Sequence, residues 1–168
     1  MRPGPIQLAL QGIAYALFAG VVGYFSTAPR YTHHDPSLAL IKVNFSHSGA
    51  RIRECRRYTA EELEQIAPNM RQELDCPRER VAVGFELLID GERVFSDELV
   101  PGGLSRDGNS VIYQRFPIDP GTHVIQARLR DSRRVSGFDY EKTETVVLTP
   151  LQNFLIDFRA ETGGFKFL

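Results

Sequence analysis

A long uncharged run near the start of the chain limits what this sequence can fold into. Residues 6–25 contain no charged side chain, and only Gln7 and Gln11 are strongly polar. Twenty helical residues span about 30 Å, the hydrocarbon thickness of a bilayer. The alternative of a buried helix in a soluble domain is disfavoured, because residues 12–25 offer no polar face. The sequence therefore predicts an N-terminal transmembrane anchor over residues 1–30.

A cleaved secretory signal is the alternative interpretation of the same run. The apolar stretch is longer than the 7–15 residues usual for a signal. Cleavage after Ala28 would place Pro29 directly behind the cut, which disfavours processing there. Arg2 favours a cytoplasmic amino terminus, although Arg30 weakens the charge asymmetry. We therefore expect an uncleaved single-pass anchor, with residues 31–168 outside the cytoplasm.

Small residues recur along the predicted anchor. Gly12, Ala16 and Gly20 are spaced by four positions, and Ala19 and Gly23 repeat this spacing on a neighbouring stripe. Small residues at this spacing allow another helix to approach closely. Glycine and alanine are also simply common in membrane helices. We expect the stripe of Gly12, Ala16 and Gly20 to pack against a helix of an integral membrane protein.

The rest of the chain has the pattern of a β protein. Asp90-Gly91 joins two apolar runs, as in a two-residue hairpin, and Asp119-Pro120-Gly121 predicts another turn. The expected strands cover residues 38–47, 81–89, 92–99, 111–118, 122–130, 140–148, 153–158 and 165–168. This spacing predicts a mainly β domain, an immunoglobulin-like antiparallel β-sandwich over residues 31–168. A barrel is the alternative.

One segment, at about residues 55–76, interrupts the strands. Thr59 and Glu62 have the spacing of a capping box, which starts a short helix that Pro68 limits to about two turns. Cys55 and Cys76 bracket this insertion. In an oxidising compartment they would form a disulfide worth roughly 3 kcal/mol, whereas free thiols or a redox pair are the alternatives. The sequence predicts the disulfide, because the spacing is not that of a redox Cys-x-x-Cys.

Arginines are concentrated beside the first cysteine. Arg78 follows the second cysteine, so the disulfide would bring several guanidinium groups together. We interpret the cluster as a docking patch for an acidic partner or for anionic lipid headgroups. A solvated surface balanced by nearby carboxylates is the equally weighted alternative. The predicted patch consists of Arg51, Arg53, Arg56 and Arg57.

The sequence carries no catalytic signature. The 20 Lys and Arg residues nearly balance the 21 Asp and Glu residues, which argues against a dedicated nucleic-acid binder. No nucleophile motif or phosphate-binding loop is present, so we expect neither an enzyme nor a small-molecule substrate. His33, His34 and His47 suggest a metal site only remotely, since their spacing matches no known motif. We expect no cofactor and no metal.

Several segments together resemble a group of small bacterial proteins. They are residues 26–31 behind the anchor, the Cys55–Cys76 segment with residues 67–70 inside it, and residues 156–159 with 163–165 near the end. The chain resembles small single-pass accessory proteins of proteobacterial C-family haem-copper oxidases and related respiratory complexes.

This resemblance implies an inner-membrane location and a periplasmic domain. It also implies a non-catalytic accessory, structural or assembly role, with integral membrane subunits and the lipid bilayer as partners. The absence of Cys-x-x-Cys-His excludes a covalently bound c-type haem. The alternative function is a membrane-tethered periplasmic copper chaperone or ligand-binding module.

Overall fold

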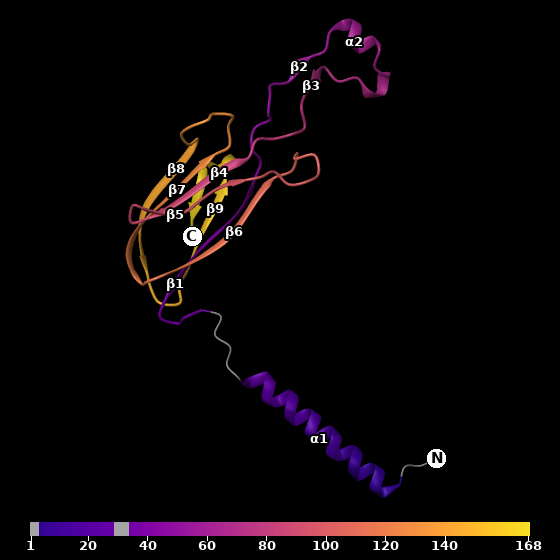
Figure 1. Ribbon diagram of the computed structural model, residues 1–168, viewed down its shortest axis with the longest axis vertical. Coiled ribbons are helices and arrows are strands. Elements are labelled where there is room, and N and C mark those ends of the chain that lie inside the picture. Colours follow the sequence, from indigo (N-terminus) through magenta and orange to yellow (C-terminus); the bar gives the residue numbers. More distant parts are fainter. Residues whose placement is uncertain (1–3, 29–33) are drawn as a thin grey trace. The chain divides into compact units, whose positions relative to one another are not determined.

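The computed structural model describes residues 4–28 and 34–168 (Figure 1). It divides the chain into two compact units, Met1–Asp35 and Pro36–Leu168, which are described separately. Some residues used in the sequence predictions lie outside the described residues: Arg2, Pro29, Arg30, Tyr31 and His33.

The first unit contains a single helix, α1 (Pro5–Thr27). Proline at its first turn suits the start of a helix, because that N–H group needs no intrahelical acceptor. None of its residues is buried. With 23 residues and an apolar composition, α1 is long and apolar enough to cross a membrane. The predicted helix over residues 6–25 is therefore confirmed as a candidate membrane span.

The second unit contains two four-stranded sheets (Figure 1). The first has the order β10-β9-β1-β6 and consists of β1 (Ala39–His47), β6 (Ser110–Ile118), β9 (Asn153–Arg159) and β10 (Gly164–Phe167). The second has the order β5-β4-β7-β8 and consists of β4 (Val83–Ile89), β5 (Glu92–Leu99), β7 (Gly121–Arg130) and β8 (Tyr140–Leu148). A 3₁₀ turn, η2 (Ala160–Thr162), connects β9 to β10. The mainly β prediction is confirmed.

One hydrophobic core holds the two sheets together. In β1 the odd-numbered residues through Phe45 are buried, while Asn44 and Ser46 are exposed, which is the alternation of a half-buried strand. The core is rich in aromatic rings: Phe85 lies 5.2 Å from Phe45 and 6.0 Å from Phe165, between ring centroids. The fully buried centre draws on both sheets: Ile41, Val43, Val83, Phe85, Leu87, Ile125, Leu129 and Ile156.

One pair of strands departs from the antiparallel arrangement expected from the sequence. β1 and β9 are neighbours and run parallel, whereas the other neighbouring strands of both sheets pair antiparallel. The cause is the turn between β8 and β9, where Leu151 N–H donates to Leu38 O at 2.9 Å. This hydrogen bond holds the beginning of β9 at the same end of the sheet as the beginning of β1. Both strands then run in the same direction.

A histidine connects two turns at that end of the domain. Asp90 and Gly91 form the predicted hairpin turn with φ of 54° and 84°. His123 Nδ1 lies 2.7 Å from Asp90 Oδ2, and His123 Nε2 lies 2.9 Å from the carbonyl oxygen of Asp119. Both ring nitrogens therefore face acceptors, which favours the protonated imidazolium. The Asp90 carboxylate accordingly raises the pKa of His123 above its ordinary value.

This arrangement predicts a pH dependence of stability. The folded pKa of His123 lies above the unfolded value of about 6.5. The stabilisation that protonated His123 gives to the folded state is therefore fully present below that pH. It is lost as the pH rises through the folded pKa. In urea unfolding, the free energy of unfolding should fall less between pH 6 and pH 9 for His123→Gln than for the wild type. The exposed His34→Gln variant is the control, and an unchanged pH dependence in His123→Gln would contradict the prediction.

Candidate docking arm closed by a disulfide

An arm of residues 51–80 extends from the end of the domain where β1 finishes and β4 begins (Figure 1). At its base an isolated bridge pairs Arg51 with Arg80, and Ile52 N–H donates to the carbonyl oxygen of Glu79 at 3.1 Å. The arm thus begins several residues outside the predicted boundaries of the insertion.

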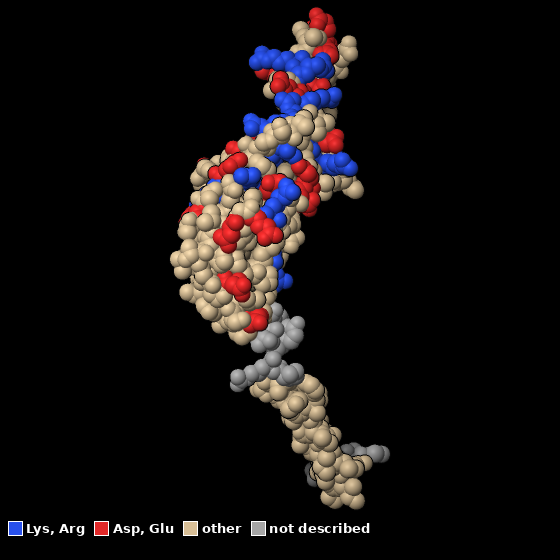
Figure 2. Space-filling view, turned by 60° about the vertical axis from the view of Figure 1, so that its left-hand side comes forward, with Lys and Arg blue, Asp and Glu red and all other residues tan. Residues whose placement is uncertain are grey.

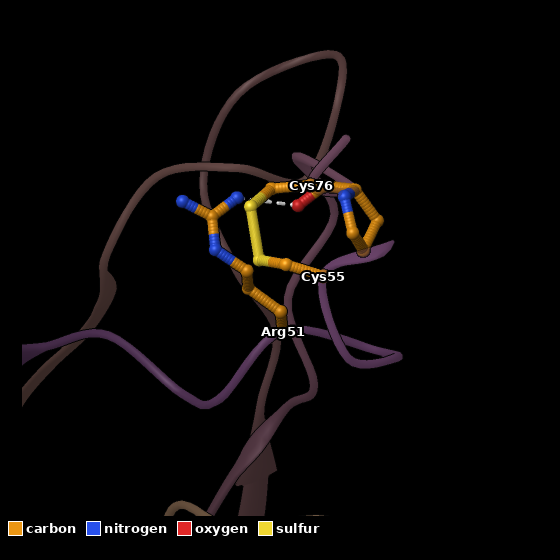
Figure 3. The surroundings of a disulfide bond; sticks show 4 residues. Arg51, Cys55 and Cys76 are labelled. Atoms are coloured by element: carbon orange, nitrogen blue, oxygen red, sulfur yellow. Dashed lines mark hydrogen bonds between the residues drawn. A yellow bond between two sulfur atoms is a disulfide. The ribbon is translucent and has the colours of Figure 1, made fainter. Parts of the chain in front are cut away.

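The predicted disulfide closes the arm above this base (Figure 3). Cys55 and Cys76 are joined with an S–S distance of 2.09 Å. The guanidinium group of Arg51 lies beside the bridge and donates to the carbonyl oxygen of Pro77 at 2.5 Å. Arg51 and the disulfide therefore both fix the base of the arm.

Short elements follow the disulfide toward the tip. β2 (Arg56–Arg57) and β3 (Leu74–Asp75) form a two-stranded ribbon, and between them lie α2 (Ala60–Glu64) and the 3₁₀ turn η1 (Pro68–Met70). The capping box is present as predicted. Glu62 N–H donates to Thr59 Oγ1 at 3.3 Å, and Thr59 N–H donates to a Glu62 carboxylate oxygen at 2.8 Å. A helix of five residues needs such support, because it cannot persist alone in water.

Arg56 connects the ribbon to the helix. Its guanidinium group lies 2.8 Å from Glu62 Oε1 and 3.3 Å from Asp75 Oδ2, and stands 5.1 Å from the ring centroid of Tyr58. The two carboxylates raise the pKa of Arg56, Glu62 more than Asp75. The Thr59 N–H and then Arg56 lower the pKa of Glu62. Arg56 is thus engaged within the arm rather than presented to a partner.

The four arginines of the predicted patch have different surroundings. Arg51 is half-buried at the base and Arg56 is ion-paired, as described above. The side chains of Arg53 and Arg57 are exposed, and neither forms a hydrogen bond or an ion pair with residues 4–28 or 34–168. Figure 2 shows acidic and basic side chains intermixed over the arm, at the top of the view. The docking patch remains a prediction, and its available cations are Arg53 and Arg57.

The arm adds nothing to the hydrophobic core. No residue of β2, α2, η1 or β3 is buried, and the core residues come from the two sheets and η2. Several apolar side chains of the arm face solvent: Ile52, Met70 and Leu74. The disulfide, the capping box and the Arg56 ion pairs therefore order a segment that contributes nothing to the core of the two sheets. Such a segment is suited to contact with another molecule.

The predicted helix stripe lies on an open surface of α1. A Cβ atom added at Gly12 or Gly20 would meet nothing within 4 Å. Ala16 and Gly20 line a shallow apolar groove of about 500 Å³, and Leu17 and Tyr24 also line it. The groove can accept a neighbouring side chain, but the packing of α1 against a partner helix remains a prediction.

The histidines considered as metal ligands have separate environments. His47 is half-buried, with Nε2 2.7 Å from Asp131 Oδ2 and its ring 4.8 Å from that of Phe158, between centroids. His34 is exposed, and His33 lies outside the described residues. Across residues 4–28 and 34–168, no three His, Cys, Asp or Glu side chains are grouped to hold a metal ion. The sequence could not reveal the Asp131 partner, since it lies 84 positions away.

Comparison of the chain with known protein families, with curated proteins and with solved structures finds no match. The resemblance to respiratory accessory proteins therefore stays a prediction, and the function is inferred from the helix, the domain and the arm.

Removing the disulfide should release the arm and leave the two large sheets folded. In Cys55→Ser/Cys76→Ser, trypsin should cleave the arm, which is rich in arginine, at least tenfold faster, because local unfolding exposes its backbone. The melting temperature should fall only modestly, because the freed arm is disordered in both states and the domain loses only the roughly 1 kcal/mol needed to close a longer loop between β1 and β4. Mass spectrometry of a digestion time course, with the oxidised wild type as control, checks both points. An arm that stays protected without its disulfide would contradict this account.

Proposed function

We propose that the chain is a membrane-anchored, non-catalytic accessory or assembly protein of a larger membrane complex. The observation that carries the proposal is an ordered, solvent-exposed arm in a chain that also has a helix suited to crossing a membrane. Neither feature is required by the core of the two sheets. Two separate contact surfaces, one in the bilayer and one outside it, are what such a subunit needs.

Topology forms part of this proposal. The disulfide favours an oxidising compartment, which supports a periplasmic domain and a cytoplasmic amino terminus. The facing sheets with their single core support an immunoglobulin-like assignment of the domain, despite the parallel pair β1 and β9. The sequence resemblance makes an inner-membrane respiratory complex of the haem-copper oxidase type the first partner to test.

The position of the arm within the domain favours a protein partner over lipid headgroups. Pro36 and the following residues lead into β1 at one end of the first sheet, and the arm leaves from the other end. The nine residues of β1 separate these two points by about 30 Å. Arg53 and Arg57 therefore lie far along the domain from its start at Pro36, and a partner with acidic side chains would suit them.

Purification from native membranes tests the proposal. Full-length tagged protein should recover integral membrane subunits in constant proportion. Ala16→Leu should reduce that recovery about tenfold or more, because a larger side chain prevents close approach of a partner helix. Ala14→Leu, on the opposite face of α1, is the matched control and should recover wild-type amounts. Equal recovery by both variants would exclude the stripe as an interface, and a wild type that recovers no membrane protein would contradict the proposed function.

A further inference from the structure

The first sheet contains an opening between two of its central strands. β1 and β9 pair only over Leu40–Val43 and Asn153–Ile156. Beyond this point β1 continues along β6 alone, as far as His47, and β9 continues along β10 alone, as far as Arg159. A cleft of about 620 Å³ occupies the place where the two strands separate. It lies at the end of the sheet from which the arm leaves.

Backbone groups of β1 point into this opening. Leu40 N–H donates to Gln152 O at 2.9 Å, which shows that the even-numbered residues of β1 direct their backbone toward β9. Because strand residues alternate in this direction, Ser46 also directs its N–H and C=O groups to that side. At Ser46 the strand β9 is no longer paired with β1. Ser46 therefore presents strand-type hydrogen-bonding groups that no strand of the described structure meets.

On the other side of the opening, β9 also directs backbone groups toward it. Leu155 exchanges two backbone hydrogen bonds with Leu168, so the odd-numbered residues of β9 direct their N–H and C=O groups toward the β10 side. The backbone groups of Phe158 are consequently directed toward the opening, and its N–H donates to the Asp157 side chain at 2.8 Å. A side-chain carboxylate thus occupies the position of a missing strand partner.

Aromatic rings close the floor of the cleft. The ring of Phe158 lies 5.7 Å from that of Phe45 and 4.8 Å from that of His47, between centroids. A ligand can therefore lie along the surface of the sheet but cannot enter the core. The rim is polar: Asn109 Nδ2 donates to Ser46 Oγ at 3.1 Å on one side, and Asp157 with Arg159 forms the other.

We propose that this opening binds an extended polypeptide segment of the partner subunit, by addition of a β-strand. An unpaired strand edge supplies main-chain hydrogen bonds to such a segment without requiring a particular sequence. The segment pairs with the Ser46 edge of β1 and carries glycine or alanine where it faces the aromatic floor. This inference rests on the proposed function, since the partner that contacts the arm provides the segment.

Hydrogen exchange on the intact assembly tests the inference. Amide exchange is measured by mass spectrometry on the full-length chain, purified alone and in the complex recovered from native membranes. Peptides covering residues 44–48 should exchange at least tenfold more slowly in the complex, because strand pairing protects amides. Unchanged exchange there, in a complex that has formed, overturns the inference and leaves the proposed function intact. Failure to recover any partner overturns the proposed function as well.

A pair of substitutions at one position gives a second readout. Ser46→Pro removes the N–H that faces the opening, whereas Ser46→Thr keeps it. Proline should lower recovery of the partner roughly threefold to tenfold, as expected for the loss of a main-chain hydrogen bond, and threonine should not. Equal recovery with both variants counts against strand addition. If the proline variant fails to fold, the exchange experiment on the unmodified chain still decides.

Discussion

Residues 31–168, produced without the anchor, are expected to fold as a soluble monomer and to bind the partner complex 10²–10⁴-fold more weakly than the full chain, a range typical of losing one of two linked contacts. The core lies entirely within the second unit, so removal of α1 costs the domain no buried contact. Under the proposed function, α1 confines the domain near its target and so raises its effective concentration. Titration of the detergent-solubilised complex with the fragment measures the difference.

A chimera separates confinement from helix packing. It joins residues 31–168 to an unrelated leucine-rich membrane helix, which restores confinement but lacks the small residues of α1. We expect this chimera to recover only part of the lost affinity. A soluble fragment that binds as tightly as the full chain would remove the role assigned to α1. A fragment that turns over a substrate by itself would contradict the non-catalytic proposal.

Phe85→Ala is expected to be the most damaging single substitution in the core. Phe85 is 1% exposed and contacts the rings of Phe45, Phe95 and Phe165. Truncating a buried phenylalanine removes its transfer free energy and leaves a cavity, at a cost of about 3–5 kcal/mol. For a domain of this size the melting temperature should fall by roughly 10–20 °C. Thermal unfolding followed by circular dichroism measures the shift.

Leu104→Ala provides the control for this experiment. Leu104 is 107% exposed on the loop between β5 and β6, and its truncation should change stability by less than about 0.5 kcal/mol. A loss at Phe85 no larger than the loss at Leu104 would show that the two sheets do not share one core.

Local signals in the sequence were sufficient for the individual elements. The apolar run marked α1, and the strand expected over residues 38–47 begins within one residue of the observed start of β1. Asp90-Gly91 indicated a turn that needs positive φ at both positions, and the structure has it. Thr59 and Glu62 predicted the capping box. Each of these signals depends on residues within a few positions of one another, where backbone sterics and short-range hydrogen bonds dominate.

The sequence could not show which arginines of the predicted patch are available. Arg51 and Arg56 look equivalent to Arg53 and Arg57 in the sequence, since all four precede the helix of the arm. Their difference depends on partners that only the folded ribbon brings close, such as Asp75, which lies 19 positions from Arg56. The two-residue strands β2 and β3 also escaped prediction, because they are too short to show a period.

The order of the strands was decided by tertiary structure. Alternation tells which residues of a strand face inward, but it does not tell which strand lies beside it. β1 meets β9 in parallel because the turn after β8 returns the chain to the end where β1 begins, through the contact between Leu151 and Leu38. The same pairing stops at Val43 and Ile156, which creates the opening in the sheet. The sequence by itself therefore determined the candidate membrane helix, the eight strands of the two large sheets and the disulfide. The neighbours of each strand, and the two surfaces proposed here for a partner, follow from contacts between residues far apart in the chain.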